Sequence, residues 1–463
     1  NIRVHPKPRI LVCAPSNAAV DHIVERLMRE GLRDGNGSYV PAMLRVGPLQ
    51  SCGERIRDVT LDHQVDALMG RVGELEHHKA RMRALLEGKQ RLRDQAPLYG
   101  GEWPREFEEE VVASRQECAE CMELIKRLEA AAGKHARPGE DPREALRTSI
   151  VGSAEIVLTT LSSSGMRCIT HSPPFETVII DEACQAVEAS CLIPLQTGAS
   201  RCVLVGDPRQ LPAFVLSAEP GADLYQRSLF QRFEEAGWPV IMLKTQYRMH
   251  PSIRKFPSRY FYGSQLTDAP SVDPSRRRSP VEGDEWVRHL CFYDLVGSRE
   301  HRPDGKSLTN GDEAEFCCAL VAHLFAAWAG TLDMRGRVAI LTPYRQQVRT
   351  IAQAIKRRFG CEIPQGASGN MHLSSRGVDV DVMTVDSCQG QERDVVILSC
   401  VRASPRGNIG FLQDVRRMNV ALTRAKHSLV VVGNSQALRR CDAWRDFVCE
   451  AARVGAAFPV QRP

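Results

Sequence analysis

The segment Val178-Ile179-Ile180-Asp181-Glu182-Ala183 places two adjacent carboxylates directly after an apolar run. Consecutive β-branched residues favour a strand that is buried on both faces, as in a parallel sheet covered by helices. In open sheets of this kind, ligands bind outside the carboxyl ends of the strands. The segment therefore predicts a buried strand that carries Asp181 and Glu182 to the ligand-binding edge of an α/β domain.

Short apolar runs of the same kind recur along the chain, and helical patterns lie between several of them. This alternation predicts parallel sheets in α/β domains. A length of 463 residues fits roughly two to four domains. Residues 268–312 are polar and rich in Pro, Gly and Arg, which predicts a long loop or insertion. The runs expected to form strands are 9–14, 156–158, 178–180, 202–205, 240–243, 338–341, 395–399 and 429–432.

Residues 61–132 follow a different pattern, with a stripe of mostly apolar residues spaced alternately four and three apart. One stripe runs from Leu61 to Leu86 and a second from Phe107 to Ala132, and a breaker segment at 97–104 separates them. The spacing predicts an antiparallel helical hairpin with a coiled-coil seam. Two interpretations are equally open: a stalk that braces another domain or contacts nucleic acid, or a surface insertion.

The composition is that of a globular protein, with 43% hydrophobic and 25% charged residues. A net charge of +5 permits nucleic-acid binding without arguing for it. No apolar run is long enough for a membrane span, and no signal peptide is visible. The 16 cysteines are scattered, which favours reduced, buried thiols. Cys118 and Cys121 lack a second ligand pair for zinc and fall on the predicted helical seam.

The carboxylate pair has the chemistry that a nucleoside triphosphatase needs. Asp181 is suited to hold Mg²⁺, and Glu182 to orient or deprotonate the attacking water. The alternative is a solvated acidic pair at the start of a helix. Gln210 follows a second apolar run and could contact a γ-phosphate. Arg248 and Arg424 could stabilise the charge that develops in phosphoryl transfer.

The order and spacing of these segments resemble the superfamily 1B helicases of the up-frameshift and senataxin type. The resemblance covers residues 9–30 and about 150–435. It implies two RecA-like parallel-sheet lobes: lobe 1 from 1–60 and 148–240, lobe 2 from 241–463, and the hairpin inserted at 61–147. The matching segments are Leu11–Asp21, Leu158–Ser162, Val178–Ala183, Gly206–Pro212, Gln246–His250, Thr342–Tyr344, Thr384–Glu392 and Asn419–Lys426.

The resemblance also implies roles for single residues. Asp181 would bind Mg²⁺ and Glu182 would activate water, while Gln210, Arg248, Gly390 and Arg424 would surround the γ-phosphate of ATP. Tyr247 would stack near the adenine, and Glu392 would lie near the ribose. The implied activity is ATP-driven 5′-to-3′ unwinding of RNA, DNA or their hybrids. The residues expected at the nucleic-acid backbone are Pro15, Ser16, Asn17, Thr160, Thr342 and Ser387.

The sequence departs from this family in one important respect, because it contains no Gly-x-x-x-x-Gly-Lys-Ser/Thr phosphate-binding loop. Gly305-Lys306-Ser307 is not a substitute, since Glu300 stands where the first glycine is required. In the family this loop precedes the segment at which the chain begins, and its strand is internal to the first sheet. We therefore expect a fragment with exposed apolar sheet edges that is inactive alone. Two smaller departures are Cys184, where the family usually has a small residue such as Ala, and Cys388, where it usually has Phe.

Three hypotheses follow from the sequence. The first is an active ATP-dependent helicase of which this chain is a part, acting on single-stranded RNA or DNA in the nucleus or cytoplasm, with no membrane partner. The second is a degenerate protein that binds nucleic acid without hydrolysing ATP. The third, a coiled-coil adaptor, accounts only for the hairpin. The retained catalytic residue types favour the first hypothesis.

Overall fold

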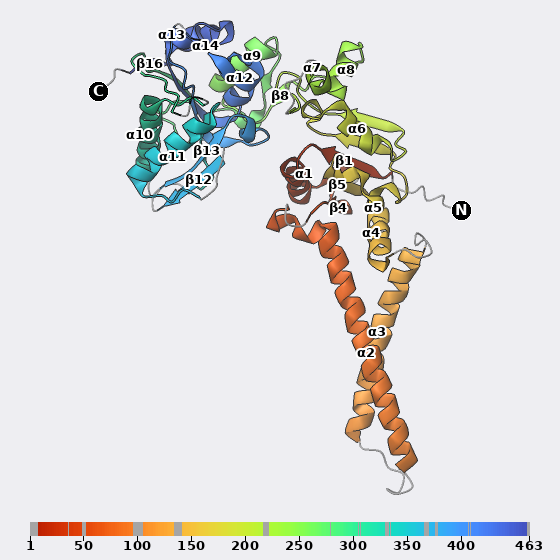
Figure 1. Ribbon diagram of the computed structural model, residues 1–463. Coiled ribbons are helices and arrows are strands. Elements are labelled where there is room, and N and C mark those ends of the chain that lie inside the picture. Colours follow the sequence, from red (N-terminus) through yellow and green to blue (C-terminus); the bar gives the residue numbers. More distant parts are fainter. Residues whose placement is uncertain are drawn as a thin grey trace. The chain divides into compact units, whose positions relative to one another are not determined.

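The computed structural model describes residues 8–35, 37–48, 52–95, 105–133, 141–215, 222–277, 279–303, 305, 307–328, 333, 335–364, 370–375, 378–405, 407 and 409–460. The chain folds as two compact units (Figure 1). The first unit contains Asn1–Asp207 and Pro212–Trp238, and the second contains Pro208–Leu211 and Pro239–Pro463. The short segment 208–211 thus groups with the second unit, although its place in the sequence put it with the first.

The first unit is built on a parallel sheet, which in the described residues has the strand order β4-β5-β1-β6-β7. Leu11 and Cys13 of β1 belong to the core on one face, while Ile10 and Val12 pack against the core on the other. Both faces are therefore apolar, which explains the continuous apolar runs in the sequence. The strands are β1 Ile10–Ala14, β4 Met43–Val46, β5 Ile156–Thr160, β6 Thr177–Ile180 and β7 Arg201–Leu204.

Helices and short turns surround this sheet. Helix α1 Asn17–Glu30 follows Ser16, whose side chain accepts a hydrogen bond from the Ala19 amide, and is capped at its end by Gly31 with φ 66°. The other helices are α4 Pro142–Ser153, α5 Arg167–Thr170, α6 Glu188–Leu195, α7 Ala222–Gln226 and α8 Leu229–Glu235, with 3-10 turns η2 Glu54–Val59, η4 Ser163–Gly165 and η5 Ala183–Gln185. Strands β2 Leu32–Asp34 and β3 Gly37–Tyr39 form a small antiparallel hairpin.

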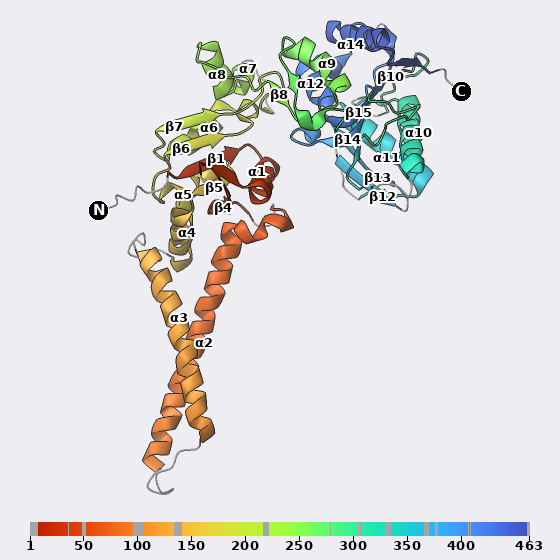
Figure 2. The ribbon, with the colours of Figure 1, turned by 180° about the vertical axis from the view of Figure 1, so that it is seen from behind.

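Two long helices extend from the first unit and lie against each other (Figures 1 and 2). They are α2 Leu61–Gln95 and α3 Arg105–Gly133, which confirms the predicted helical hairpin. Val65, Val111, Ser114 and Cys118 are buried along the seam, as the four–three spacing predicts. At the base of the hairpin, Arg147 of α4 lies 2.6 Å from Asp62 of α2. The breaker segment 97–104 lies outside the described residues.

The second unit contains a larger sheet, with the described strand order β12-β13-β11-β14-β15-β10-β16. All neighbouring strands are parallel except the antiparallel pair β12–β13. The bounds are β10 Leu290–Asp294, β11 Val338–Thr342, β12 Asn370–Ser375, β13 Val378–Thr384, β14 Arg393–Ser399, β15 Ala425–Gly433 and β16 Ala457–Pro459. A separate short pair joins β8 Thr245–Gln246 to β9 Thr267–Asp268. The prediction of two α/β parallel-sheet lobes is confirmed.

Helices cover both faces of this second sheet. Residues of α10 Gly311–Trp328 and α11 Arg345–Phe359 share one core with Val338 and Ile340. Residues of α9 Pro251–Phe261, α12 Val415–Leu422 and α14 Asp442–Arg453 share the other with Ala339 and Leu341. The remaining short elements are α13 Ser435–Leu438, η6 Pro270–Val272, η7 Asp386–Cys388 and η8 Gly410–Gln413. No described helix combines the length and apolar character that crossing a membrane requires.

Two sequence predictions about this unit are wrong. Residues 268–312 are not simply a loop, because they contain β10, which lies between β15 and β16 in the sheet. Its five residues are too short to stand out locally, and pairing with β15 supplies the hydrogen bonds that make it a strand. The apolar run 240–243 was expected to be a strand but has no strand partner in the described structure. Ile241 is 88% exposed and Leu243 is 79% exposed.

Candidate active site

The carboxylate pair stands at the carboxyl end of β6, as the sequence predicts. The Asp181 amide donates a 2.8 Å hydrogen bond to the carbonyl of Cys13 in β1. Glu182 has φ 52° and ψ 37°, a left-handed conformation that costs a residue other than Gly about 1 kcal/mol. Only a three-residue 3-10 turn follows it, so this is not the start of a regular helix. Such strain at the end of a central strand is typical of functional sites.

The neighbouring turn packs tightly against this pair. The Ala183 amide donates to the Val205 carbonyl at 2.8 Å. A Cβ on Gly206 would lie 2.9 Å from the Cys184 sulfur and 3.0 Å from the Cys184 nitrogen, so only glycine fits there. Burial raises the pKa of Asp181, and a hydrogen bond from the Glu182 backbone acts in the opposite direction. The Glu182 carboxylate accepts a hydrogen bond from the Gln185 side-chain amide.

The residues predicted to touch nucleic acid in the first unit follow the adjacent strands β1 and β5. Ala14 and Thr160 are register partners, so the turns after them lie at the same sheet edge. The Ser16 hydroxyl caps α1, and the Thr160 hydroxyl donates to Ser163 at 3.0 Å. Pro15 directly follows β1 and is half-buried. The side chains of this edge therefore also hold its backbone in place.

Sequence reasoning missed a residue beneath this edge. Arg45 of β4 is fully buried, and its guanidinium lies 2.8 Å from Asp21 and 2.7 Å from the side-chain oxygen of Asn17. Asn17 thus has a structural partner besides its predicted role. A lone Arg in an otherwise apolar strand was the available sequence signal, but its partners lie 24 and 28 positions earlier.

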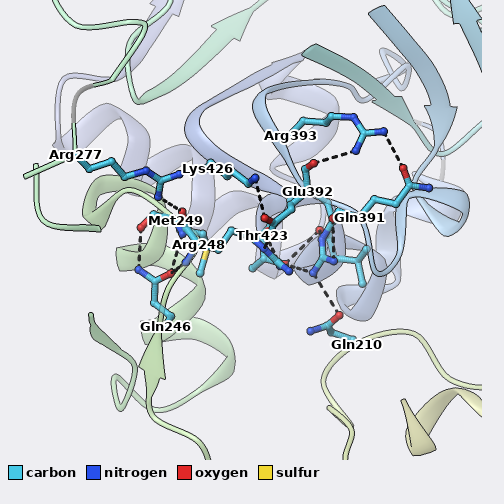
Figure 3. Close-up of polar contacts among 12 residues, drawn as sticks. Gln210, Gln246, Arg248, Met249, Arg277, Gln391, Glu392, Arg393, Thr423 and Lys426 are labelled. Atoms are coloured by element: carbon cyan, nitrogen blue, oxygen red, sulfur yellow. Dashed lines mark hydrogen bonds and ion pairs between the residues drawn. The ribbon is translucent and has the colours of Figure 1, made fainter. Parts of the chain in front are cut away.

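In the second unit, Gln246 shapes the turn that contains Arg248 and Met249 (Figure 3). Its side-chain oxygen accepts hydrogen bonds from the amides of Arg248 and Met249 at 2.9 and 2.7 Å. Its side-chain nitrogen donates to the Met249 carbonyl at 2.8 Å. Tyr247 is 71% exposed, so its ring is available for stacking.

The carboxylate of Glu392 joins Arg248 of this turn to Lys426 of β15 (Figure 3). Arg248 donates from Nε to Glu392 at 2.6 Å, and the Lys426 ammonium lies 2.8 Å from the other carboxylate oxygen. Burial opposes ionisation of Glu392, but the hydrogen bonds from Lys426 and Arg248 outweigh it and lower its pKa to about 2. No role was predicted for Lys426, and no local pattern indicated that it would meet Glu392.

Arg424 lies under this cluster and is only 2% exposed. Its guanidinium donates to the carbonyls of Val420 and Gln391 at 3.0 and 3.4 Å. It also lies 3.4 Å from the side-chain oxygen of Gln210, which groups with this unit (Figure 3). The structure thus brings together Arg424, Gln210, Arg248 and Glu392.

The loop after β13 carries the remaining predicted residues. Gly390 has φ 75° with open space where a Cβ would point, which allows close approach to its backbone. The Ser387 hydroxyl lies 2.8 Å from that of Thr384. Thr342 is fully buried, so its side chain is not presented at the surface as the resemblance implies. Its carbonyl accepts the Val385 amide at 3.1 Å and joins the two strand ends.

Comparisons with known proteins identify the family of the chain. Two family profiles, each described as an AAA domain, match residues 1–218 and 225–436. The chain is 36% identical to "Probable helicase MAGATAMA 3" of Arabidopsis thaliana over 464 residues, and this match covers 98% of the chain. It is 36% identical to "Helicase SEN1" of Saccharomyces cerevisiae and 30% identical to human "Probable helicase senataxin". The chain belongs to the superfamily 1 helicases of the up-frameshift and senataxin type.

The chain spans less than half the length of these helicase relatives. It covers 47% of the Arabidopsis protein, 20% of the yeast protein and 17% of human senataxin. Among solved structures, the arterivirus nonstructural protein 10 helicase is 12% identical with a TM-score of 0.31, over 92% of this chain and 59% of that one.

Proposed function

We propose that the protein containing this chain hydrolyses ATP to move along single-stranded nucleic acid and unwind it. The observation that carries the proposal is the carboxylate pair at the end of β6, with Glu182 held in a left-handed conformation. Family membership supports the same activity, and it implies 5′-to-3′ movement. Backbone-directed contacts do not read sequence, so the substrate class is single-stranded RNA or DNA. The resemblance to senataxin favours a nuclear setting over a cytoplasmic one.

The residues around Asp181 fit a magnesium ion. Carboxylate oxygens are the ligands that Mg²⁺ prefers, and the ion would neutralise charge on the triphosphate. Burial disfavours the ionised form of Asp181, and a nearby divalent cation would restore it. Glu182 is the adjacent acceptor for a proton from water. The hydrogen bond from Gln185 orients that carboxylate.

The second unit would bind the nucleotide through residues that the structure has already positioned. Tyr247 offers an exposed ring for the adenine, and the Gly390 turn leaves its backbone accessible. Arg248 is held by Glu392, so its guanidinium is oriented before any substrate binds. Arg424 and Gln210 form a second donor pair. These groups suit stabilisation of negative charge on a transferring phosphoryl group.

The phosphate-binding loop would come from a further strand that completes the first sheet. Strand β7 lies at the edge of this sheet, and among the described strands it pairs on one side only. Its Val203 is 46% exposed, and the adjoining Val205 is 38% exposed. An apolar strand at a sheet edge is normally paired or covered. We place the missing strand of the longer protein against this edge.

Replacing Glu182 with Gln in the longer protein tests the catalytic assignment. Loss of a general base costs about 10²–10⁴-fold in rate, whereas ATP binding does not need the negative charge. We expect phosphate release to fall at least a hundredfold while a fluorescent ATP analogue still binds. Glu188→Gln is the matched control, because this nearby carboxylate pairs with Arg232 at 2.7 Å. Full turnover by Glu182→Gln would contradict the assigned role.

The second candidate function is nucleic-acid binding without hydrolysis, for which the turns that follow β1 and β5 at one sheet edge would suffice. The same assay separates the two. If the unaltered longer protein binds oligonucleotides but releases no phosphate with them present, the binding-only function is correct.

A further inference from the structure

A cavity of about 520 Å³ lies in the second unit, outside the cluster around Arg248 and Arg424. Its walls come from the loop that follows β14, from η8, and from Tyr344, two residues after β11. It therefore sits at the carboxyl ends of two adjacent parallel strands, where open α/β sheets bind ligands. Its volume is within the range of small-molecule sites.

Two aromatic rings and a guanidinium form one wall of the cavity. The rings of Tyr344 and Phe411 have centroids 5.6 Å apart and are tilted by 59°. The guanidinium carbon of Arg417 lies 5.3 Å from the Phe411 centroid. Tyr344 is 5% exposed, whereas Phe411 is 54% exposed. The ring of Phe411 is therefore accessible to a ligand beside Arg417, while the buried ring of Tyr344 packs against it.

The part of the cavity wall next to Tyr344 is held by buried hydrogen bonds. Arg402 is 5% exposed and donates from Nε to Glu300 at 2.9 Å. A Cβ on Gly410, which has φ 58°, would lie 2.9 Å from the Arg402 guanidinium and 3.0 Å from the Tyr344 hydroxyl. The Tyr344 oxygen lies beside Arg402, which can only donate, and no described acceptor takes the phenol proton. The hydroxyl is itself enclosed, so it shapes this wall of the cavity and is not exposed to solvent.

The backbone entering this wall is strained and anchored. Val401 has φ 71°, which is rare for a β-branched residue. Its amide donates at 2.8 Å to the buried carboxyl of Glu313, which also accepts from Ser399 at 2.6 Å. The anchored strain fixes the direction in which Arg402 leaves the strand. Strain of this kind persists where the surrounding structure holds a site in shape.

The charges around the cavity limit what it can bind. Arg402 is paired with Glu300, and Arg417 is paired with Asp386 and Asp414, which also lines the cavity. Arg302 stands exposed at the rim, and no carboxylate among the described residues pairs with it. The interior is thus aromatic and nearly neutral, with one cation at its edge. A single nucleotide fits this cavity better than an acidic peptide does. Its base can lie on the aromatic ring and its one phosphate can pair with the one cation, whereas a run of acidic side chains would need several cations.

We propose that this cavity receives one unstacked nucleotide of the single strand, with its base on Phe411 and its phosphate at Arg302. The proposal rests on the proposed function and adds a base-holding position to it. The location of the cavity agrees with this proposal. Arg417 in its wall donates to Asp386, and the next residue, Ser387, is expected at the nucleic-acid backbone. Stacking tolerates any base, so the position grips the strand without reading its sequence.

Fluorescence anisotropy with labelled twelve-nucleotide oligouridine and oligothymidine tests the proposal on the longer protein. Loss of one stacked base weakens binding about tenfold, so we expect this for Phe411→Ala with one or both oligonucleotides. Phe411→Trp should retain binding. Trp286→Ala is the matched control, because Trp286 is a 53% exposed aromatic residue of the same unit.

Arg302→Ala provides a second, independent measurement. Loss of one phosphate contact should reduce the slope of log affinity against log salt by about 0.7 for a single strand. Equal affinities for Phe411→Ala and Trp286→Ala, with normal binding by the unaltered protein, would overturn this proposal alone. Failure of the unaltered protein to bind either oligonucleotide would overturn the proposed function as well. A labelled oligoglutamate peptide is the last probe. If the unaltered protein binds it and Phe411→Ala and Arg302→Ala each abolish that binding, the occupant of the cavity is an acidic peptide instead.

Discussion

Replacing Glu313 with Gln should remove a large part of the pH dependence of stability in the second unit. Glu313 is fully buried in α10 and accepts hydrogen bonds from Ser399, the Val401 amide and Asn310. Burial raises the pKa of its carboxyl from 4.5 to about 8, although these hydrogen bonds act in the opposite direction. The neutral form therefore predominates in the folded protein at pH 7. Gln keeps an acceptor oxygen and cannot ionise.

The sign and size of the effect follow from proton linkage. Below pH 4.5 the carboxyl is protonated in both states, so the stability that its neutral form provides is fully present. Between pH 4.5 and 8 the folded state binds more protons than the unfolded state, so stability falls as pH rises. One full proton corresponds to about 1.36 kcal/mol per pH unit. From pH 5 to 8 the loss is therefore about 4 kcal/mol, and it levels off above the folded pKa.

Urea unfolding followed by tryptophan fluorescence at pH 5, 6, 7 and 8 measures this slope. Burial lowers the pKa of His250 and His427 to about 4, so these residues add an opposite slope below their unfolded pKa of 6.5. The difference between variant and unaltered protein removes their contribution. Glu315→Gln is the control, because Glu315 lies on the same helix but is 62% exposed. The reasoning is refuted if Glu313→Gln shows the same slope as the unaltered protein.

Three further predictions concern the positioning of the candidate site. Arg45→Met should lower the free energy of unfolding by about 1–3 kcal/mol, because it leaves the carboxylate of Asp21, which is 16% exposed, without its ion-pair partner. A change below about 0.5 kcal/mol in chemical denaturation would count against this ion pair. Gly206→Ala should destabilise the first unit by about 1–3 kcal/mol, because the new Cβ meets the Cys184 sulfur at 2.9 Å. Adding Cys184→Ala to the same protein should recover part of the lost stability, as measured by thermal unfolding. Gly390→Ala should cost about 1–2 kcal/mol because of its φ of 75°, and equal melting temperatures for the two proteins would argue against the left-handed turn.

The sequence alone was sufficient for the local structure of its most strongly patterned segments. Three consecutive β-branched residues before Asp181 predicted a buried strand, and the strand is there because both faces of a parallel sheet are covered. The alternating four–three spacing in 61–132 predicted the helical hairpin for a similar reason, since a seam repeats with the period of the helix. Such patterns act over a few residues, so they can be recognised without knowing the rest of the fold.

The tertiary structure decided which distant groups meet. Arg248 bonds to Glu392, 144 positions later in the chain, and no local pattern indicates this partner. The five residues of β10 became a strand only because β15 and β16 lie on either side, while the more apolar run 240–243 did not. Burial and pairing depend on every segment that reaches a given place. The residue types of the candidate site could therefore be predicted from the sequence, whereas its ion pairs, the buried Arg45 and the cavity beside Phe411 are products of the folded chain.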